Sequence, residues 1–293
     1  MHWRDFIPSV IIYIINYMKT LQNYISNTID KGLWDGHIHM FDHTGTINKD
    51  IIDSDYNCVC FADIVFKFED EYNDHRIIDL YDEFISKHYN CHKHILLATG
   101  NNAEDIISIY QKYPGVIKGF GELKCYGEGV NGTLPYDDLN WIYPVLEFNT
   151  MNLPVYIHYD LNTADHQMQF ETLLQNFPNT PIVLCHCGMC EDCNKDDVFE
   201  FVKKAQDNYD NLWIDISKHE SCDFFLRNPN KLLHLDQNKI IIGTDINPIL
   251  DYSVVIDDPY RYSVKCYDNI KRLRRLVDYT KNIKQLFKKD LHK

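Results

Sequence analysis

Two histidines spaced two residues apart, His37 and His39, could hold one metal ion between them. They close an apolar run that begins at Leu33. Side chains alternate faces along a β-strand, so both imidazoles would point to the same side. Imidazole is a frequent ligand of divalent metals, but a His-x-His pair alone is weak evidence. The other ligands must therefore come from elsewhere in the chain.

Seven further short apolar runs follow the first one, and most are separated by stretches with helical periodicity, such as 137–149 and 196–208. The spacing of successive runs matches the length of one βα unit. The eight runs cover 33–40, 57–62, 94–99, 116–123, 154–158, 181–186, 212–217 and 239–244. This pattern predicts an α/β fold, a (β/α)8 TIM barrel. A doubly wound open sheet is the alternative, but it would usually place a glycine-rich phosphate loop after the first strand.

A chain of 293 residues is a normal length for one such barrel, and no linker or repeat divides it, so residues 33–293 are predicted to form a single domain. Residues 1–32 are predicted to add an N-terminal helical extension. Its apolar part, 7–18, is too short to cross a bilayer and is not followed by a small-residue cleavage site. A signal anchor or a membrane-surface helix is the alternative. We expect no stable membrane insertion.

The composition limits the kinds of partner that the protein can bind and the cellular compartment in which we expect it. A formal charge of −14 argues against nucleic acid and against anionic membranes. A hydrophobic content of 45% is ample for a large core. Several of the ten cysteines lie inside apolar runs, where a reduced thiol is a small core residue, and a core of this size needs no disulfides. We expect a cytoplasmic protein with a small-molecule substrate, and a homodimer remains open.

Polar side chains end five of the eight runs, at the edge where a barrel keeps its site. Any single histidine at a strand end is more often simply hydrogen-bonded. Five strands ending in this way predict a joint metal site. The residues are His37, His39, Glu122, His158, His186 and Asp245.

The order His-x-His, Glu or Lys, His, His and Asp resembles that of the amidohydrolase superfamily. The local sequence motifs are most similar to those of its decarboxylase and lactonase-like branch, amidohydrolase-2. The resemblance covers about residues 33–287. Pro248 stands one residue later than in the family's Gly-(Ser/Thr)-Asp-x-Pro phrase. The motifs are Asp35-Gly36-His37-Ile38-His39, Leu153-Pro154-Val155-Tyr156-Ile157-His158, His186-Cys187-Gly188 and Gly243-Thr244-Asp245.

This resemblance implies that His37, His39 and His158 bind a divalent metal with Asp245 beside it. Zn²⁺ is the expected ion, with Mn²⁺ and Fe²⁺ as alternatives. Metal-activated water would attack an ester, lactone or amide carbonyl, and Asp245 would act as the general base. His186 would orient the substrate oxygen or bind a second metal.

The number of ions depends on the fourth strand, where Glu122 and Lys124 share one face. Family members with two ions use a glutamate or a carboxylated lysine here, so one or two ions remain open. The alternatives are a Glu122–Lys124 ion pair, or a Glu122–histidine contact, in a one-metal site. Glu122 also resembles the glutamate of the metal-dependent DNase branch, but the negative net charge argues against DNA.

Three further residues, Tyr159, Lys218 and Arg261, follow predicted strands and could bind substrate. Lys218 or Arg261 would suit a carboxylate, although a residue in such a position is more often simply a solvated loop residue.

Cys187, Cys190 and Cys193 have a C-x2-C-x2-C spacing that resembles part of an iron–sulfur or zinc site. Free thiols near the mouth of the site are the alternative. Cys185, in the preceding strand, is expected to face the outer helices.

Three functions are consistent with these residues. The first is the hydrolase just described. The second is non-oxidative decarboxylation of a small carboxylic acid at the same site, which would release CO2 without hydrolysis. The third is a barrel that binds a partner without catalysis, which would show no affinity for Zn²⁺ or Mn²⁺.

Overall fold

The computed structural model describes residues 34–41, 57–64, 77–100, 102–125, 138–245 and 268–287. The N-terminal extension predicted at 1–32 lies outside these residues. Among the described helices, none is both long and apolar enough to cross a lipid bilayer.

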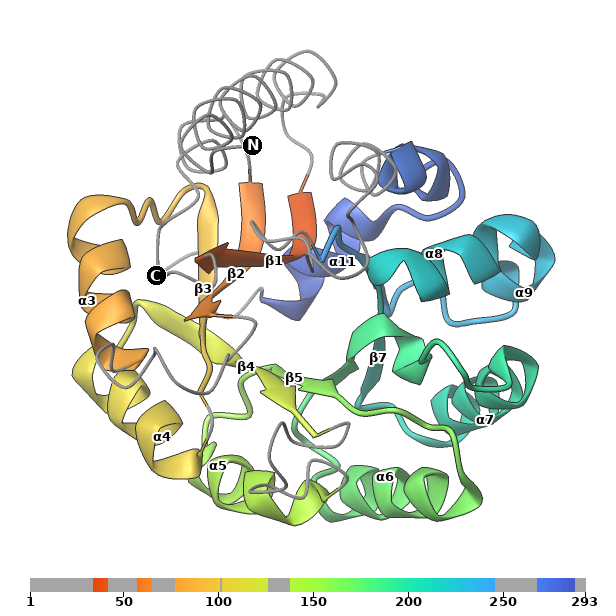
Figure 1. Ribbon diagram of the computed structural model, residues 1–293, viewed down its shortest axis with the longest axis horizontal. Helices are drawn as coiled ribbons and strands as arrows, with labels where there is room; N and C mark the ends of the chain where they lie inside the picture. Colours follow the sequence, from red (N-terminus) through yellow and green to blue (C-terminus); the bar gives the residue numbers. More distant parts are fainter. Residues whose placement is uncertain are drawn as a thin grey trace, which may run out of the picture.

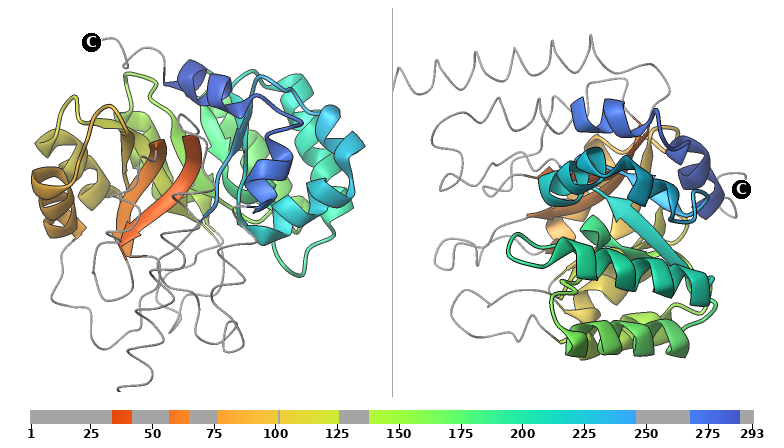
Figure 2. Two further views of the ribbon diagram at one scale, coloured as in Figure 1. Left: turned by 90° about the horizontal axis from the view of Figure 1, so that it is seen from above. Right: turned by 90° about the vertical axis from the view of Figure 1, so that its right-hand side faces the viewer.

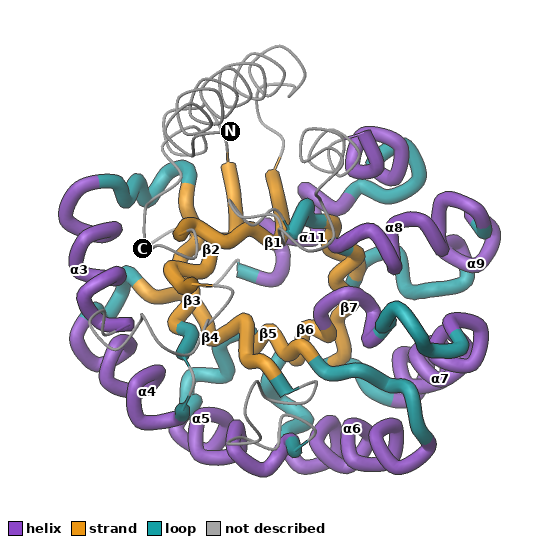
Figure 3. The backbone as a smooth tube through the Cα atoms, viewed as in Figure 1, coloured by secondary structure: helices purple, strands orange, loops and turns teal. Residues whose placement is uncertain are grey.

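Eight parallel strands form one sheet in the order of the sequence. Figures 1 and 3 show them as a ring seen nearly end-on, with the helices outside. This arrangement confirms the predicted TIM barrel. The strands are β1 (Trp34–Phe41), β2 (Asn57–Ile64), β3 (His94–Ala98), β4 (Ile117–Lys124), β5 (Val155–His158), β6 (Ile182–Leu184), β7 (Leu212–Ile216) and β8 (Ile240–Ile242).

Helices cover the outside of the ring, as the side views in Figure 2 also show. Several begin where a polar side chain accepts a hydrogen bond from the first helical turn, as Asn102, Thr163 and Asn194 do. The described helices are α3 (Ile77–Lys87), α4 (Ala103–Lys112), η2 (Leu139–Ile142), α5 (Tyr143–Phe148), α6 (Ala164–Asn176), η3 (Cys185–Gly188), α7 (Lys195–Asn208), α8 (Lys218–Arg227), α9 (Pro229–Leu233) and α11 (Tyr279–Leu286).

The ring closes between β1 and β8 through a buried aspartate. Asp35 Oδ1 accepts hydrogen bonds from the backbone N–H groups of His37 (3.0 Å) and Thr244 (2.9 Å), and Thr244 Oγ1 donates to Asp35 Oδ2 (2.5 Å). The backbone N–H of Asp245 donates to the carbonyl of His37 (3.0 Å). The first and last strands are therefore fixed to each other at the level of the predicted ligands.

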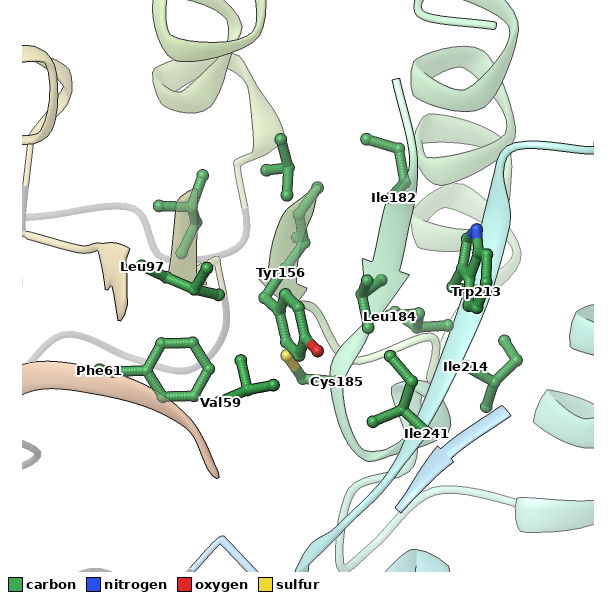
Figure 4. Packing of buried hydrophobic residues seen from close by; sticks show 14 of the residues in the cluster. Val59, Phe61, Leu97, Tyr156, Ile182, Leu184, Cys185, Trp213, Ile214 and Ile241 are labelled. Atoms are coloured by element: carbon green, nitrogen blue, oxygen red, sulfur yellow. The ribbon is translucent and has the colours of Figure 1, made fainter. Parts of the chain in front are cut away.

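Side chains fill the barrel interior, and Figure 4 shows part of this packing around Phe61 and Tyr156. Strands that are buried on both faces read as nearly continuous apolar runs, which explains why the sequence revealed all eight. The expectation for Cys185 is wrong. Its Sγ lies within 4.8 Å of ligand atoms of His37 and Asp215, so the thiol faces the barrel interior and not the outer helices.

Two strands, β6 and β8, are three residues shorter than predicted. β6 ends at Leu184 because the chain turns into η3, where His186 and Cys187 have φ values of 54° and 58°. β8 ends at Ile242, two residues before Thr244. The polar groups of these strands therefore lie on the turns that follow them, where the backbone can bend them toward the barrel axis.

His94, at the start of β3, gives a testable pH dependence. Its Nδ1 accepts a hydrogen bond from the backbone N–H of Asn90 (3.1 Å). Burial, helped by the charges of Lys93 and His88, lowers the pKa of His94 to about 4. The unfolded chain, with a histidine pKa near 6.5, takes up a proton that the folded protein does not. His94 therefore contributes stability above pH 6.5 that is lost as the pH falls toward 4, up to about 3 kcal/mol.

We expect the free energy of unfolding, measured by urea titration from pH 7.5 to 4, to fall less steeply in His94→Asn, because asparagine keeps an acceptor but does not titrate. The exposed neighbour His92→Asn is the matched control and should keep the wild-type slope. Equal slopes in wild type and His94→Asn would contradict the assignment.

Candidate metal centre

Six side chains from five strand ends meet at the carboxyl end of the barrel. One subgroup comes from β1 and the turn after β8. The Nε2 atoms of His37 and His39 are 3.4 Å apart, and each lies 3.3 Å from Asp245 Oδ1. Their ligand atoms all lie within 4.8 Å of one another, a spacing that suits one shared cation.

The second subgroup surrounds Glu122 at the end of β4. Glu122 Oε1 lies 2.8 Å from His158 Nδ1 and 3.2 Å from His186 Nε2. The imidazole rings of His158 and His186 have centroids 4.3 Å apart. His158, which the resemblance assigned to the same ion as the β1 pair, thus lies beside Glu122 and His186.

Glu122 also reaches the first subgroup. Its Oε2 lies 3.5 Å from His39 Nε2, and its Oε1 lies 3.7 Å from His37 Nε2. The two carboxylate oxygens therefore contact histidines of both subgroups. This carboxylate is the link between the two halves of the cluster.

Both carboxylates are held in their charged form. Burial opposes ionisation of Glu122, but the hydrogen bonds of His158 and His186 and the charge of His37 outweigh it, so the pKa of Glu122 lies well below its usual range. The same balance, with His186, His37 and His39 as neighbours, keeps the pKa of Asp245 well below its usual range. Among the described residues, the ion pairs of both carboxylates are to histidines.

The imidazoles of the cluster differ in their proton affinity. Burial lowers the pKa of His37, but the charge of Asp215 and its hydrogen bond outweigh burial, and the net shift is well upward. Burial and the neighbouring His186 charge lower the pKa of His158 to about 3. Neutral His158 offers a lone pair, which is the form that binds a metal.

Several residues at this edge adopt the left-handed backbone region that side chains other than glycine rarely enter. They include His186, Lys218 and Asp245, with φ values of 54°, 61° and 53°. Such conformations cost of order 1 kcal/mol each and persist where the surrounding structure imposes them. Their occurrence at three strand ends places this unusual backbone at the edge where the predicted ligands meet.

Glycine is required where β4 passes β5, immediately before Glu122. Gly121 has a φ of 124°, and a Cβ built on it would lie 2.5 Å from the carbonyl oxygen of Tyr156. The close approach of the two strands is what brings Glu122 next to His158.

Three buried polar residues support the site although the sequence assigned them no role, namely Asp35, Asp215 and Ser217. Asp35 closes the β1–β8 seam, and Asp215 Oδ2 lies 2.7 Å from His37 Nδ1. The signal for Asp215 was present, because a carboxylate inside an apolar strand must be paired.

The three predicted substrate-binding residues have different outcomes. Lys218 is half-buried after β7, with its Nζ 3.5 Å from Glu220 Oε1, and its charge contributes to the lowered pKa of His158. Tyr159 is fully buried, and its hydroxyl donates to Gln169 Oε1 on α6 (3.1 Å), which is a packing position. Arg261 lies outside the described residues.

The cysteine triplet after β6 does not assemble as a metal site. Cys187, Cys190 and Cys193 belong to none of the groups of ligand atoms found among the described residues. Instead, the backbone N–H of Cys190 donates to Cys193 Sγ (3.2 Å). Burial, followed by hydrogen bonding to Cys193, raises the pKa of Cys190 to about 12, so this residue stays a thiol.

The Amidohydro_2 family of amidohydrolases matches residues 126–277, just over half of the chain. The chain therefore belongs to the amidohydrolase family. The matched range contains His158, His186 and Asp245, and the fold brings the β1 histidines and Glu122 to the same edge. A search of curated proteins found no match.

Solved structures share the fold at low sequence identity. A crystal structure described as a probable 2-pyrone-4,6-dicarboxylic acid hydrolase from Acinetobacter baumannii, with citric acid bound, has a TM-score of 0.53 and 13% identity over 88% of this chain and 99% of that one. A 2,6-dihydroxybenzoate decarboxylase, in complex with 2,6-dihydroxybenzoate, has a TM-score of 0.52 and 13% identity over 87% and 99%. A zinc-bound amidohydrolase from Burkholderia multivorans has a TM-score of 0.52 and 9% identity over 87% and 98%.

The contact between Gly243 and His37 allows a test of the geometry. A Cβ at residue 243 would lie 2.4 Å from His37 Cβ and 2.6 Å from His37 N, so Gly243→Ala must displace the first histidine. We expect this variant to keep its circular dichroism spectrum but to bind less than half of the wild-type zinc in equilibrium dialysis.

Gly115→Ala is the matched control. Gly115 has a φ of 82° with nothing within 4 Å of a Cβ, so alanine there strains the backbone by about 1 kcal/mol without touching the site. It should be somewhat less stable with unchanged zinc. Equal zinc content in both variants would contradict the packing of β8 against His37.

Proposed function

We propose that this protein is a divalent-metal-dependent hydrolase of an ester, lactone or amide bond in a small molecule. The observation that carries the proposal is the convergence of four imidazoles and two ionised carboxylates at the carboxyl end of the barrel. Family membership supports the same class of chemistry.

The donor set fits a divalent cation. Nitrogen and oxygen ligands of this kind suit Zn²⁺, with Mn²⁺ and Fe²⁺ as alternatives. His158 is neutral, so the imidazoles do not fully compensate the two buried carboxylates, and a bound cation would supply the missing positive charge. When bound, the cation would polarise a substrate carbonyl and make water a stronger acid.

Asp245 is the proposed general base. Its side chain is 16% exposed, whereas that of Glu122 is 2% exposed, so Asp245 is the carboxylate that solvent and substrate reach. It is ionised at neutral pH because of its lowered pKa. We infer that it accepts the proton of the attacking water and later donates it to the leaving group. Lys218, at the same edge, would attract a carboxylate group on the substrate.

Two ions are favoured over one, because Glu122 presents its two oxygens to different histidines. Oε2 lies 3.5 Å from His39 Nε2, whereas Oε1 lies nearest to His158 and His186 and is farther, 3.7 Å, from His37 Nε2. One tetrahedral Zn²⁺ needs only four ligands, and the cluster offers six side chains. We propose that one ion would be held by His37, His39 and Asp245 and another by His158 and His186, with Glu122 available to both.

The general base is tested with Asp245→Asn, which keeps the side-chain shape but removes the basic oxygen. We expect kcat to fall by about 10²- to 10⁴-fold with bound zinc retained, in a screen of lactones, esters and amides. Asp160→Asn, at the same mouth and 3.9 Å from His158, is the control and should keep most of the activity. Full turnover in Asp245→Asn would rule out the role of Asp245 as general base. Release of CO2 from a carboxylic acid, without hydrolysis of any tested substrate, would contradict the hydrolase proposal and favour a decarboxylase.

The metal count is tested by mass spectrometry of zinc-loaded, dialysed protein. We expect about two ions per chain in the wild type and about one in Glu122→Gln, since a neutral amide bridges poorly. Glu220→Gln, which changes a buried carboxylate in the first turn of α8, should retain both. One ion in the wild-type protein would contradict the bridging role of Glu122.

A further inference from the structure

A chain of hydrogen bonds through Asp215, on β7, and Ser217, directly after it, connects two of the proposed ligand histidines. His37 Nδ1 lies 2.7 Å from Asp215 Oδ2, and Ser217 Oγ lies 2.5 Å from the same oxygen. His186 Nδ1 lies 2.9 Å from Ser217 Oγ. All four side chains are buried, with no more than 1% exposed.

The protons in this chain follow from the chemistry of the groups. The Ser217 hydroxyl donates to Asp215 Oδ2, and the same oxygen accepts from His37 through Nδ1–H. The single Ser217 proton is then used, and Ser217 can only accept from His186. Both histidines therefore carry a proton on Nδ1.

The other nitrogens of these rings point into the cluster. Nε2 of His37 lies 3.3 Å from Asp245 Oδ1, and Nε2 of His186 lies 3.2 Å from Glu122 Oε1. A proton fixed on Nδ1 leaves the Nε2 lone pair for a metal. Asp215 and Ser217 thus act on two ligands that belong to different strands and to different subgroups.

The surroundings of this network favour one arrangement. The Cys185 thiol lies against His37 and Asp215. Burial raises the pKa of this thiol well above its usual range, so Cys185 stays protonated and uncharged beside the network. Phe61 packs on His37 with ring centroids 4.7 Å apart. A dry environment strengthens the hydrogen bonds and makes an unpaired Nδ1–H costly.

We propose that Asp215 and Ser217 are positioning residues that set the tautomers of both His37 and His186. One hydrogen-bond network would thus prepare a ligand of each subgroup to bind metal through Nε2. The inference rests on the proposed metal-dependent function. It assigns to Asp215 and Ser217, which are not among the six proposed ligands, the orientation of ligands from β1 and from the turn after β6.

The first test is zinc affinity, measured by competition with a chromophoric chelator. We expect Ser217→Ala to weaken zinc binding by about 10- to 100-fold and Ser217→Thr, which keeps the hydroxyl, to restore it. Asp215→Asn should weaken binding at least as much as Ser217→Ala, because it acts on both histidines. Ser221→Ala is the matched control, since Ser221 donates to the Ser217 carbonyl and has no role in the imidazole chain.

The second test needs no metal. In metal-free protein labelled with ¹⁵N-histidine, the ring nitrogens of His186 should show the Nδ1–H tautomer in the wild type, in Ser221→Ala and in Ser217→Thr, and a tautomer mixture in Ser217→Ala. An unchanged His186 signal in Ser217→Ala, or equal zinc affinity in Ser217→Ala and Ser221→Ala, would overturn the inference. If the tautomer changes as expected but the wild type binds no zinc, the proposed function fails and the positioning role stands.

Discussion

The carboxylate of Glu122, buried among imidazoles, is the interaction on which the rest of the site depends. A charge at 2% exposure is stable only with compensating partners, and Glu122 has histidines from β1, β5 and the turn after β6 around it. Asp245 repeats the arrangement with the β1 pair and His186. Two negative charges that share neutral or partly protonated imidazoles create a site that favours a divalent cation.

The barrel supplies this arrangement by bringing distant segments to one edge. Asp35 ties β1 to the turn after β8, so that Asp245 approaches His37 although about two hundred residues separate them. Left-handed backbone at His186, Lys218 and Asp245 turns these residues after their strands end. The stability of the apolar barrel compensates this local strain, and the predicted ligands gather at the end where the strain lies.

The sequence contained most of the fold and the positions of the predicted ligands. Buried parallel strands are apolar on both faces, so each of the eight stood out as a short run, and polar residues at their ends were visible against that background. The errors concern interactions between strands. The direction of the Cys185 side chain depends on where β6 ends. β6 ends at Leu184 because the backbone turns there, and the apolar run 181–186 does not reveal this turn. Asp215 and Ser217 could have been flagged as buried polar residues, but their partners lie on other strands and cannot be read from spacing.

The most direct measurement is X-ray absorption at the zinc edge of the zinc-loaded protein. The account predicts a first shell of nitrogen and oxygen only, at about 2.0–2.1 Å, because histidines and carboxylates form the site. Sulfur scattering at about 2.3 Å would place the ion on cysteines such as Cys187, Cys190 and Cys193 and would contradict the account. Absence of retained zinc after dialysis would contradict it as well.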